Sequence, residues 1–130
     1  MPHLQFEINR KLSEKERSLF INLVEKEFSK IMKTGTGHIA VTLRELPKNS
    51  LSLGRAKKNE NVFFMNLDIR KGRSNMQKKQ LVKVYMQGAE KIFGIKLKNQ
   101  YVTFTSHQGD DFNLYEKSLN DWKKNDKPIK

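Results

Sequence analysis

Several residue types are absent from this sequence or scarce in it. There is no cysteine, which excludes disulfides, thiolate chemistry and zinc–thiolate sites. There is no long apolar run, and 31% of the residues are charged, so we expect no segment that spans a membrane. With 130 residues the chain is long enough for one hydrophobic core. We therefore expect residues 1–130 to form a single domain in the cytoplasm.

Acidic residues are scarce as well, and the net charge is +12. Such a charge can mark a protein that binds nucleic acid or an anionic membrane. In this chain the lysines are scattered over every segment, and the densest runs are only pairs. Lysine also outnumbers arginine, whose planar fork is better suited to phosphate. We therefore expect neither nucleic acid nor a membrane as a partner.

The hydrophobic pattern predicts a β-α-β unit over about 2–45. Apolar and polar residues alternate over the first eight positions, which is typical of a strand. Ser13, followed three positions later by Glu16, has the spacing of a capping box and so predicts a helix start. Apolar residues then recur at helical spacing to about Lys33, and alternation returns over 38–45.

The same pattern recurs over about 62–105. It predicts a strand over 62–69, a helix that begins at Ser74, with Gln77 in the capping-box position, and a strand over 100–105. The two capping serines stand 61 residues apart, which indicates an internal repeat. Within each unit the helical crossover makes the two strands parallel. The expected fold is α/β (α+β), with one four-stranded mixed sheet and both helices on one face.

The remaining segments give weaker signals. Residues 46–61 are rich in turn formers, and within them only Leu51–Leu53 is typical of a short edge strand. Residues 106–130 form a tail whose apolar side chains, such as Trp122, indicate a docked segment. The sheet face without helices would carry Ala40, Thr42, Phe64 and Thr103. Because such a face is expected to be covered, we predict self-association.

The second residue is a proline that opens a strand. Removal of Met1, which a small second residue favours, would leave a secondary amine at the amino terminus. An α-amino group titrates near about 7.7–8.0, and burial or neighbouring cations lower its pKa further. An amine that is unprotonated near neutral pH can act as a general base or a nucleophile. Pro2 is therefore our candidate catalytic residue.

Arg70 and Arg73 stand three positions apart, between the end of a predicted strand and the start of a predicted helix. Two guanidinium forks at that place are suited to binding a carboxylate, helped by the free N–H groups of the helix start. They would also lower the pKa of a nearby terminal amine. The alternative is a solvated basic turn in a basic protein.

Together, Pro2 at the start of a strand, the doubled β-α-β unit and the Arg70–Ser74 segment resemble the tautomerase superfamily. This superfamily includes macrophage migration inhibitory factor, cis-3-chloroacrylic acid dehalogenase and malonate semialdehyde decarboxylase. The resemblance covers nearly the whole chain. It implies a homotrimer without a cofactor, whose sites use the amino-terminal proline and residues of a neighbouring subunit. It also implies a small carboxylate substrate, bound by Arg70 and Arg73.

The resemblance points to two further site residues. His38 begins the second predicted strand, where the family often places a polar site residue, and Tyr101 lies where the migration-inhibitory-factor branch has a site tyrosine. The alternatives are a surface histidine and a packed strand aromatic. The implied reaction is an enol–keto conversion, in which Pro2 moves a proton, or the hydration of an unsaturated acid.

Three positions depart from the specialised branches of the family. Leu114 stands where the dehalogenase branch has a water-activating glutamate, and only Asp110 or Asp111 could substitute for it. Lys30 stands where that branch has a histidine, and Gly37 where the decarboxylase branch has an aspartate. We therefore expect a tautomerase-type isomerase. A hydratase or dehalogenase, or a non-catalytic interaction trimer, stays open as the alternative.

Overall fold

The structure of the chain is a computed structural model that describes residues 2–115. Its first β-α-β unit consists of β1 (His3–Ile8), α1 (Glu14–Met32) and β2 (Ala40–Glu45). The second unit consists of β3 (Phe63–Arg70), α2 (Asn75–Phe93) and β4 (Gln100–His107). Short 3-10 turns lie at Lys48–Ser50 (η1), Leu97–Asn99 (η2) and Gly109–Asp111 (η3).

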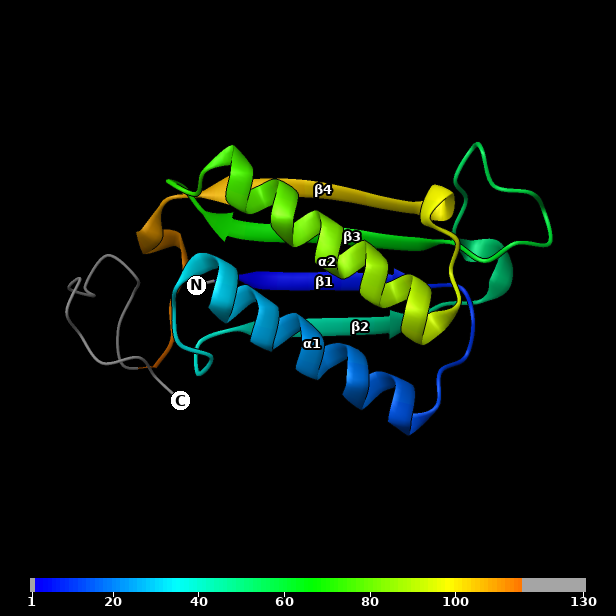
Figure 1. The fold of residues 1–130 in the computed structure, drawn as a ribbon, viewed down its shortest axis with the longest axis horizontal. Coiled ribbons are helices and arrows are strands. Elements are labelled where there is room, and N and C mark those ends of the chain that lie inside the picture. The colour runs from blue at the N-terminus through cyan, green and yellow to red at the C-terminus, as the bar shows by residue number, and fades with distance from the viewer. Residues whose placement is uncertain (1, 116–130) are drawn as a thin grey trace.

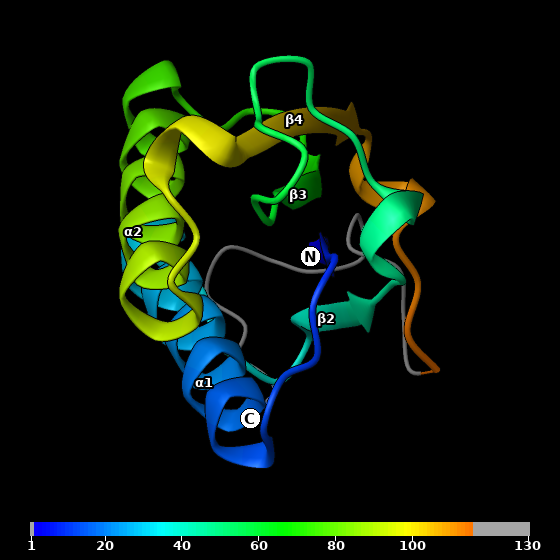
Figure 2. The ribbon, with the colours of Figure 1, turned by 90° about the vertical axis from the view of Figure 1, so that its right-hand side faces the viewer.

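The four strands form one mixed sheet in the order β2-β1-β3-β4. The outer pairs, β1 with β2 and β3 with β4, are parallel, and the central pair of β1 and β3 is antiparallel. Both helices lie in front of the sheet in Figure 1, and the edge-on view in Figure 2 places them on one side of it. The predicted fold class is therefore confirmed.

The two units share one plan. Both helices are 19 residues long and begin at positions 61 apart, and both start with a complete capping box, on Ser13 and on Ser74. Each helix also ends on a residue with a left-handed backbone, Lys33 (φ 54°) and Gly94 (φ 72°). The strand registers repeat in the same way. His3 pairs with Ala40, and Phe64 pairs with Tyr101, each of them 61 positions later in the sequence.

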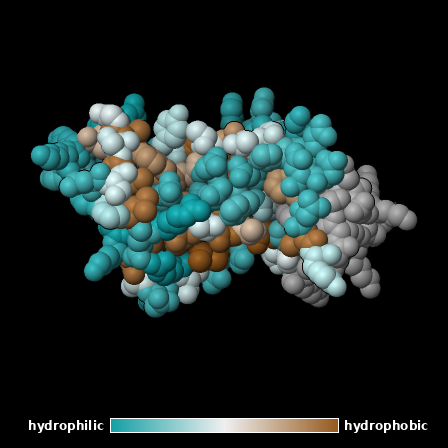
Figure 3. All heavy atoms as spheres, turned by 180° about the vertical axis from the view of Figure 1, so that it is seen from behind, coloured by the Kyte–Doolittle hydropathy of each residue, from teal (hydrophilic) through white to brown (hydrophobic). Residues whose placement is uncertain are grey.

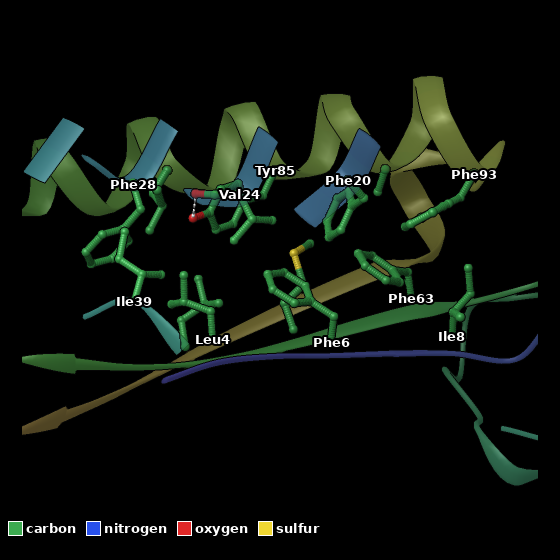
Figure 4. Packing of buried hydrophobic residues seen from close by; sticks show 14 of the residues in the cluster. Leu4, Phe6, Ile8, Phe20, Val24, Phe28, Ile39, Phe63, Tyr85 and Phe93 are labelled. Atoms are coloured by element: carbon green, nitrogen blue, oxygen red, sulfur yellow. Dashed lines mark hydrogen bonds between the residues drawn. The ribbon is translucent and has the colours of Figure 1, made fainter. Parts of the chain in front are cut away.

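The core lies between the helices and the sheet. Every second residue of β1 is fully buried there, and Figure 4 shows Leu4, Phe6 and Ile8 pointing at the helices. The ring of Phe6 lies edge-on to Phe20 of α1, with 5.0 Å between centroids. Complete burial of such side chains stabilises the fold by about 1.5–3 kcal/mol each. The alternation seen in the sequence thus decides which face of the sheet receives the helices.

Three details of the sequence prediction are wrong. β2 begins at Ala40 rather than at 38, because the amide of Ile39 bonds back to the carbonyl of Thr36 (3.1 Å) in a turn. Leu51–Leu53 forms no strand. β4 runs to His107, so the tail starts later than predicted. The tail from residue 116 onward, including Trp122, lies outside the described residues.

Within residues 2–115, no helix is long and apolar enough to cross a membrane. The opposite face of the sheet, which carries no helix, is seen in Figure 3, where hydrophobic atoms lie among hydrophilic ones. We call it the open face. It presents His3, Gln5 and Glu7 of β1, which alternate with the buried residues of that strand.

Candidate functional site

One end of the sheet brings together several segments that are distant in the sequence. Because β1 and β3 are antiparallel, the start of β1 lies beside the end of β3. The turn before β2 lies beside the start of β1, and the N-terminus of α2 follows the end of β3. The C-terminus of α1 completes the group, since hydrogen bonds link it to α2. We call this end the amino end.

Pro2 is buried at the start of β1. Its carbonyl accepts a hydrogen bond from the amide of Ala40 (3.2 Å), which is where the pairing of β1 with β2 begins. Strand alternation places the proline ring on the same face as Leu4, toward the helices. The backbone of Pro2 is therefore held by the sheet, and its ring lies on the side of the core.

His38 lies in the turn between α1 and β2, and its side chain is only 6% exposed. Its Nε2 is hydrogen-bonded to Oγ1 of Thr34 (3.0 Å). Burial lowers the pKa of His38 to about 4, and the positive charges of the amino terminus and of Arg73 act in the same direction. The imidazole is therefore neutral near pH 7. It is not a surface histidine.

Arg73 comes directly before Ser74, the N-cap of α2. Its Nη1 donates to the carbonyl of Met32 at the end of α1 (3.2 Å), and Nε2 of Gln77 donates to the carbonyl of Ile31 (3.1 Å). Burial, together with the nearby charge of Arg70, lowers the pKa of Arg73. Among the residues that the structure describes, none accepts a hydrogen bond from Nε of Arg73. The guanidinium is thus anchored on one side only.

Arg70 is the last residue of β3 and is exposed. The alternation of β3 buries Ile69 and places Arg70 on the open face, where it pairs in register with His107 of β4. Arg70 also lies near enough to Arg73 for its charge to act on that guanidinium. The structure thus brings Pro2, His38 and both predicted arginines to the amino end.

Tyr101 lies elsewhere. It pairs in register with Phe64, which pairs with Glu7 near the far end of β1. Glu7 lies five positions after Pro2, a distance of about 17 Å along β1. Tyr101 is 53% exposed and lines a hollow on the open face together with Phe64 and Arg44. Within one chain, this tyrosine is not part of the group at the amino end.

The two acidic residues considered for water activation lie in η3, just after β4. Both are exposed, and Oδ2 of Asp111 stands 3.9 Å from Nδ1 of His107. The backbone carbonyl of Asp110 accepts a hydrogen bond from Nδ2 of Asn113 (3.2 Å). Leu114 is partly buried. Both acids follow the end of β4, whose last residue, His107, pairs in register with Arg70.

Sequence reasoning missed the part that Thr34 and Gln77 play in supporting the site. Thr34 follows the predicted helix, and its hydrogen bond to His38 could have been inferred only from their spacing of four positions. Gln77 was predicted as a cap, and it also bonds the end of the other helix. In the part of the chain that the structure describes, no group of three or more His, Asp or Glu side chains could hold a metal ion.

No family model and no curated protein matches this sequence. Solved structures do match its fold. A macrophage migration inhibitory factor of Toxoplasma gondii has a TM-score of 0.77 at 10% identity, over 89% of this chain and 98% of that chain. A fused 4-OT that forms an asymmetric trimer has a TM-score of 0.77 at 16% identity, over 92% and 97%. A member of the cis-3-chloroacrylic acid dehalogenase family has a TM-score of 0.77 at 18% identity, over 90% and 82%.

These matches extend over nearly the whole of the chain and over most of each neighbour. They agree with the resemblance drawn from Pro2, the doubled unit and the Arg70–Ser74 segment. At 10–18% identity they bear on the fold and leave the reaction open. The chain has the fold of the tautomerase superfamily.

Proposed function

We propose that this protein is a cofactor-independent tautomerase-type isomerase. Pro2, freed by the removal of Met1, acts as general base and general acid on a small 2-keto, enol or unsaturated carboxylic acid. The observation that supports this function best is the position of Pro2, which is buried at the start of β1. There it shares the amino end with a buried neutral imidazole and a half-buried guanidinium. We also propose that the protein acts in the cytoplasm.

The proposed reaction is a proton shift between carbon and oxygen. The neutral amine of Pro2 takes a proton from the carbon beside the carbonyl, and the electron pair of the C–H bond moves to form an enolate. Return of the proton to the oxygen gives the enol, and the reverse order gives the ketone. Burial and the positive charge of Arg73 favour the neutral form of an amine at this place.

Arg73 and Arg70 bind the acid and stabilise the negative charge as it develops on the enolate. His38, neutral and hydrogen-bonded to Thr34, is a hydrogen-bond partner for the substrate rather than a second cation. Tyr101 takes part only from a neighbouring protomer, because it lies about 17 Å along the sheet from its own Pro2. The proposal therefore includes a homotrimer, and the fused 4-OT of similar fold forms an asymmetric trimer.

The proposed function is tested by the intact mass of the purified protein, before and after incubation with a bromo-substituted 2-keto acid. We expect a mass that lacks Met1 and one adduct, which peptide mapping assigns to Pro2. Pro2→Ala serves as the matched control, because it removes the secondary amine but leaves a free amino terminus. The Pro2→Ala variant should react more slowly than the wild type with the bromo-substituted 2-keto acid.

A retained Met1 would block the amine and contradict the enzyme proposal. The interaction trimer would then be the better reading, and partner binding that survives Pro2→Ala would support it. An adduct on lysines alone, at equal rates in both variants, would likewise show that the amino terminus has no special reactivity.

A further inference from the structure

The two helices are linked at both ends by an arginine of the segment that leads into one helix and the last carbonyl of the other. At the end of the sheet opposite Pro2, Arg10 donates from Nε (3.2 Å) and Nη2 (2.9 Å) to the carbonyl of Phe93, which ends α2. At the amino end, Nη1 of Arg73 donates to the carbonyl of Met32, which ends α1 (3.2 Å). Phe93 stands 61 positions after Met32, which is the period of the internal repeat. The two links are therefore equivalent parts of the two units.

The two arginines differ in how their charge is balanced. Glu16, the N3 residue of α1, forms an ion pair with Arg10 (Nη2 to Oε2, 2.5 Å). Its counterpart in α2, 61 positions later, is Gln77, an amide without charge. Among residues 2–115, no carboxylate forms an ion pair with Arg73. The same position of the repeat thus carries an acid at one end of the molecule and an amide at the other.

Two acids of the amino end lie beside His107 of β4. Asp68 of β3 and Asp111 of η3 each have a carboxylate oxygen 3.9 Å from a ring nitrogen of this histidine. Asp68 also accepts from Nε2 of Gln5 (3.3 Å). The alternation of β3 places Asp68 on the open face, whereas Arg73 bonds the end of α1 in the helix layer. The N3 residue of α2 therefore decides whether Arg73 has an acidic neighbour in that layer.

Gln77 is engaged through both polar atoms of its side-chain amide. Its Oε1 accepts from the backbone amide of Ser74 (2.9 Å), the N-cap of α2. Its Nε2 donates to the carbonyl of Ile31 (3.1 Å), one residue before Met32, whose carbonyl binds Arg73. The amide and the guanidinium thus bind neighbouring carbonyls in the last turn of α1. A carboxylate at this position could still accept from Ser74, but it could not donate to Ile31, and beside a guanidinium it would form an ion pair.

We propose that Gln77 is a positioning residue, which keeps the guanidinium of Arg73 free of an acidic partner and so available to the carboxylate of the substrate. Arg10 directs Nε, Nη1 and Nη2 to backbone oxygens and also pairs with its acid. Arg73 has one hydrogen bond, from Nη1, among residues 2–115, and therefore has donors left for a ligand. An acid at position 77 would compete with the substrate for these donors. This inference rests on the proposed function, which it deepens by naming a residue that acts through Arg73.

The first test compares two substitutions of Gln77 in the protein lacking Met1. Gln77→Glu keeps the shape of the side chain and changes its charge, whereas Gln77→Met keeps its length and removes both hydrogen bonds. Calorimetry measures the affinity of each variant for 2-oxopentanoate. We expect Gln77→Glu to weaken binding at least about tenfold, and Gln77→Met about threefold or less. Equal weakening by the two variants would make Gln77 a structural link only and would overturn the inference.

Glu16→Gln is the matched control, because it makes the reverse exchange at the same position of the repeat. It removes the acid beside Arg10, near the start of α1 at the opposite end of the sheet in Figure 1, and should leave the affinity for 2-oxopentanoate unchanged. Glutamate suits the N3 position of a capping box, so Gln77→Glu is expected to fold, and thermal unfolding of each variant checks this.

A double variant shows whether Gln77 acts through Arg73. Gln77→Glu combined with Arg73→Gln should weaken the binding of 2-oxopentanoate by less than the product of the two single losses, because the new acid then has no guanidinium to occupy. A loss equal to the full product would mean that the acid acts on the ligand independently of Arg73, and the positioning role would be refuted.

The second test separates this inference from the proposed function. Burial lowers the pKa of His38 to about 4, and the charge of Arg73 acts in the same direction. NMR titration of this imidazole requires neither substrate nor turnover. We expect the pKa of His38 to rise in Gln77→Glu, where the new acid balances Arg73, and to stay close to the wild-type value in Gln77→Met. An unchanged pKa in Gln77→Glu would contradict the inference.

Catalysed proton exchange at carbon 3 of 2-oxopentanoate, followed by NMR in D₂O, reports on the function. If the wild type catalyses no exchange although Gln77→Glu raises the pKa of His38 and weakens binding, the proposed function fails and the role of Gln77 stands. If the wild type and Gln77→Glu exchange equally fast with equal KM, the function stands and the role of Gln77 is refuted.

Discussion

The imidazole of His38 is held where the fold opposes its protonation. The side chain is 6% exposed, and the guanidinium of Arg73, whose charge acts on the ring, is positive. An imidazolium at this place would lose its hydration and gain repulsion. Thr34 provides a hydrogen bond that a neutral ring can satisfy. The residue therefore links the electrostatics of the amino end to the stability of the whole chain.

This linkage predicts how stability depends on pH. The pKa of His38 is about 4 in the folded protein and about 6.5 in the unfolded chain, so the unfolded state binds the proton first. The contribution is fully present above about pH 6.5 and is lost as the pH falls toward 4. We expect the free energy of unfolding, from urea titrations, to fall less between pH 7 and pH 4 in His38→Gln than in the wild type.

His3→Gln controls for the loss of an imidazole, because His3 lies partly exposed on the open face and is hydrogen-bonded to Thr42. Its pH dependence should follow the wild type. Only the slope is compared, since His38→Gln also changes packing at every pH. Parallel curves for His38→Gln and the wild type would remove His38 as the source of the effect.

The sequence predicted Pro2, His38 and two arginines as candidate site residues, but it did not predict how the fold holds them. Because Ile39 and Val41 alternate with their neighbours, the sequence predicted a strand that begins at residue 38. The ladder in fact starts where the carbonyl of Pro2 meets the amide of Ala40, a contact between distant segments that no local pattern contains. Burial raises the pKa of the Tyr85 phenol, and the charge of Glu27 on the other helix acts in the same direction.

At the scale of elements, the helices were predicted closely because their ends have strong local signals. Ser13 and Ser74 each accept from the amide three residues on, as their capping boxes require. The close packing of α1 against α2 has no comparable local signal in the sequence. Gly88 of α2 is buried against Leu23 of α1, and a Cβ on Gly88 would lie 3.0 Å from a methyl group of that leucine.

This contact gives a prediction for helix packing. Gly88→Val should destabilise the protein by about 1–3 kcal/mol, because the added methyl groups overpack the contact with Leu23. Glycine is a poor helix former, so the loss cannot come from helix propensity. Urea unfolding measures the difference, with Gln87→Val, at an exposed position of the same helix, as the control.

The double variant Gly88→Val with Leu23→Ala makes the cause specific. If the two side chains collide, the loss in the double variant is smaller than the sum of the two single losses. A Gly88→Val protein no less stable than Gln87→Val would mean that Leu23 moves aside at no cost.

At the scale of the whole molecule, the open face and the position of Tyr101 both concern how one protomer packs against another. The face carries no helix, and a tyrosine and a phenylalanine lie in its hollow, 6.4 Å apart between ring centroids. A single chain leaves this hollow at the opposite end of the sheet from Pro2. The sequence pattern of each unit cannot predict where this hollow lies relative to Pro2. That position depends on the antiparallel pairing of β1 with β3, which forms only when the two units pack together. In the proposed homotrimer, the hollow of one protomer would meet the amino end of another.

Mixing of two inactive variants tests that arrangement. Pro2→Ala lacks the amine but keeps Tyr101, and Tyr101→Ala has the reverse defect, so each alone should lose proton exchange on 2-oxopentanoate. When the two are unfolded together and refolded as mixed trimers, a site with both wild-type residues forms wherever the tyrosine of one variant meets the proline of the other. We therefore expect activity to return on mixing and light scattering to give a trimer.

Mixing Pro2→Ala with Arg73→Ala is the control, because both residues lie at the amino end of one chain and every site then stays defective. A monomer in solution, or no recovery with Tyr101→Ala, would remove the tyrosine from the site.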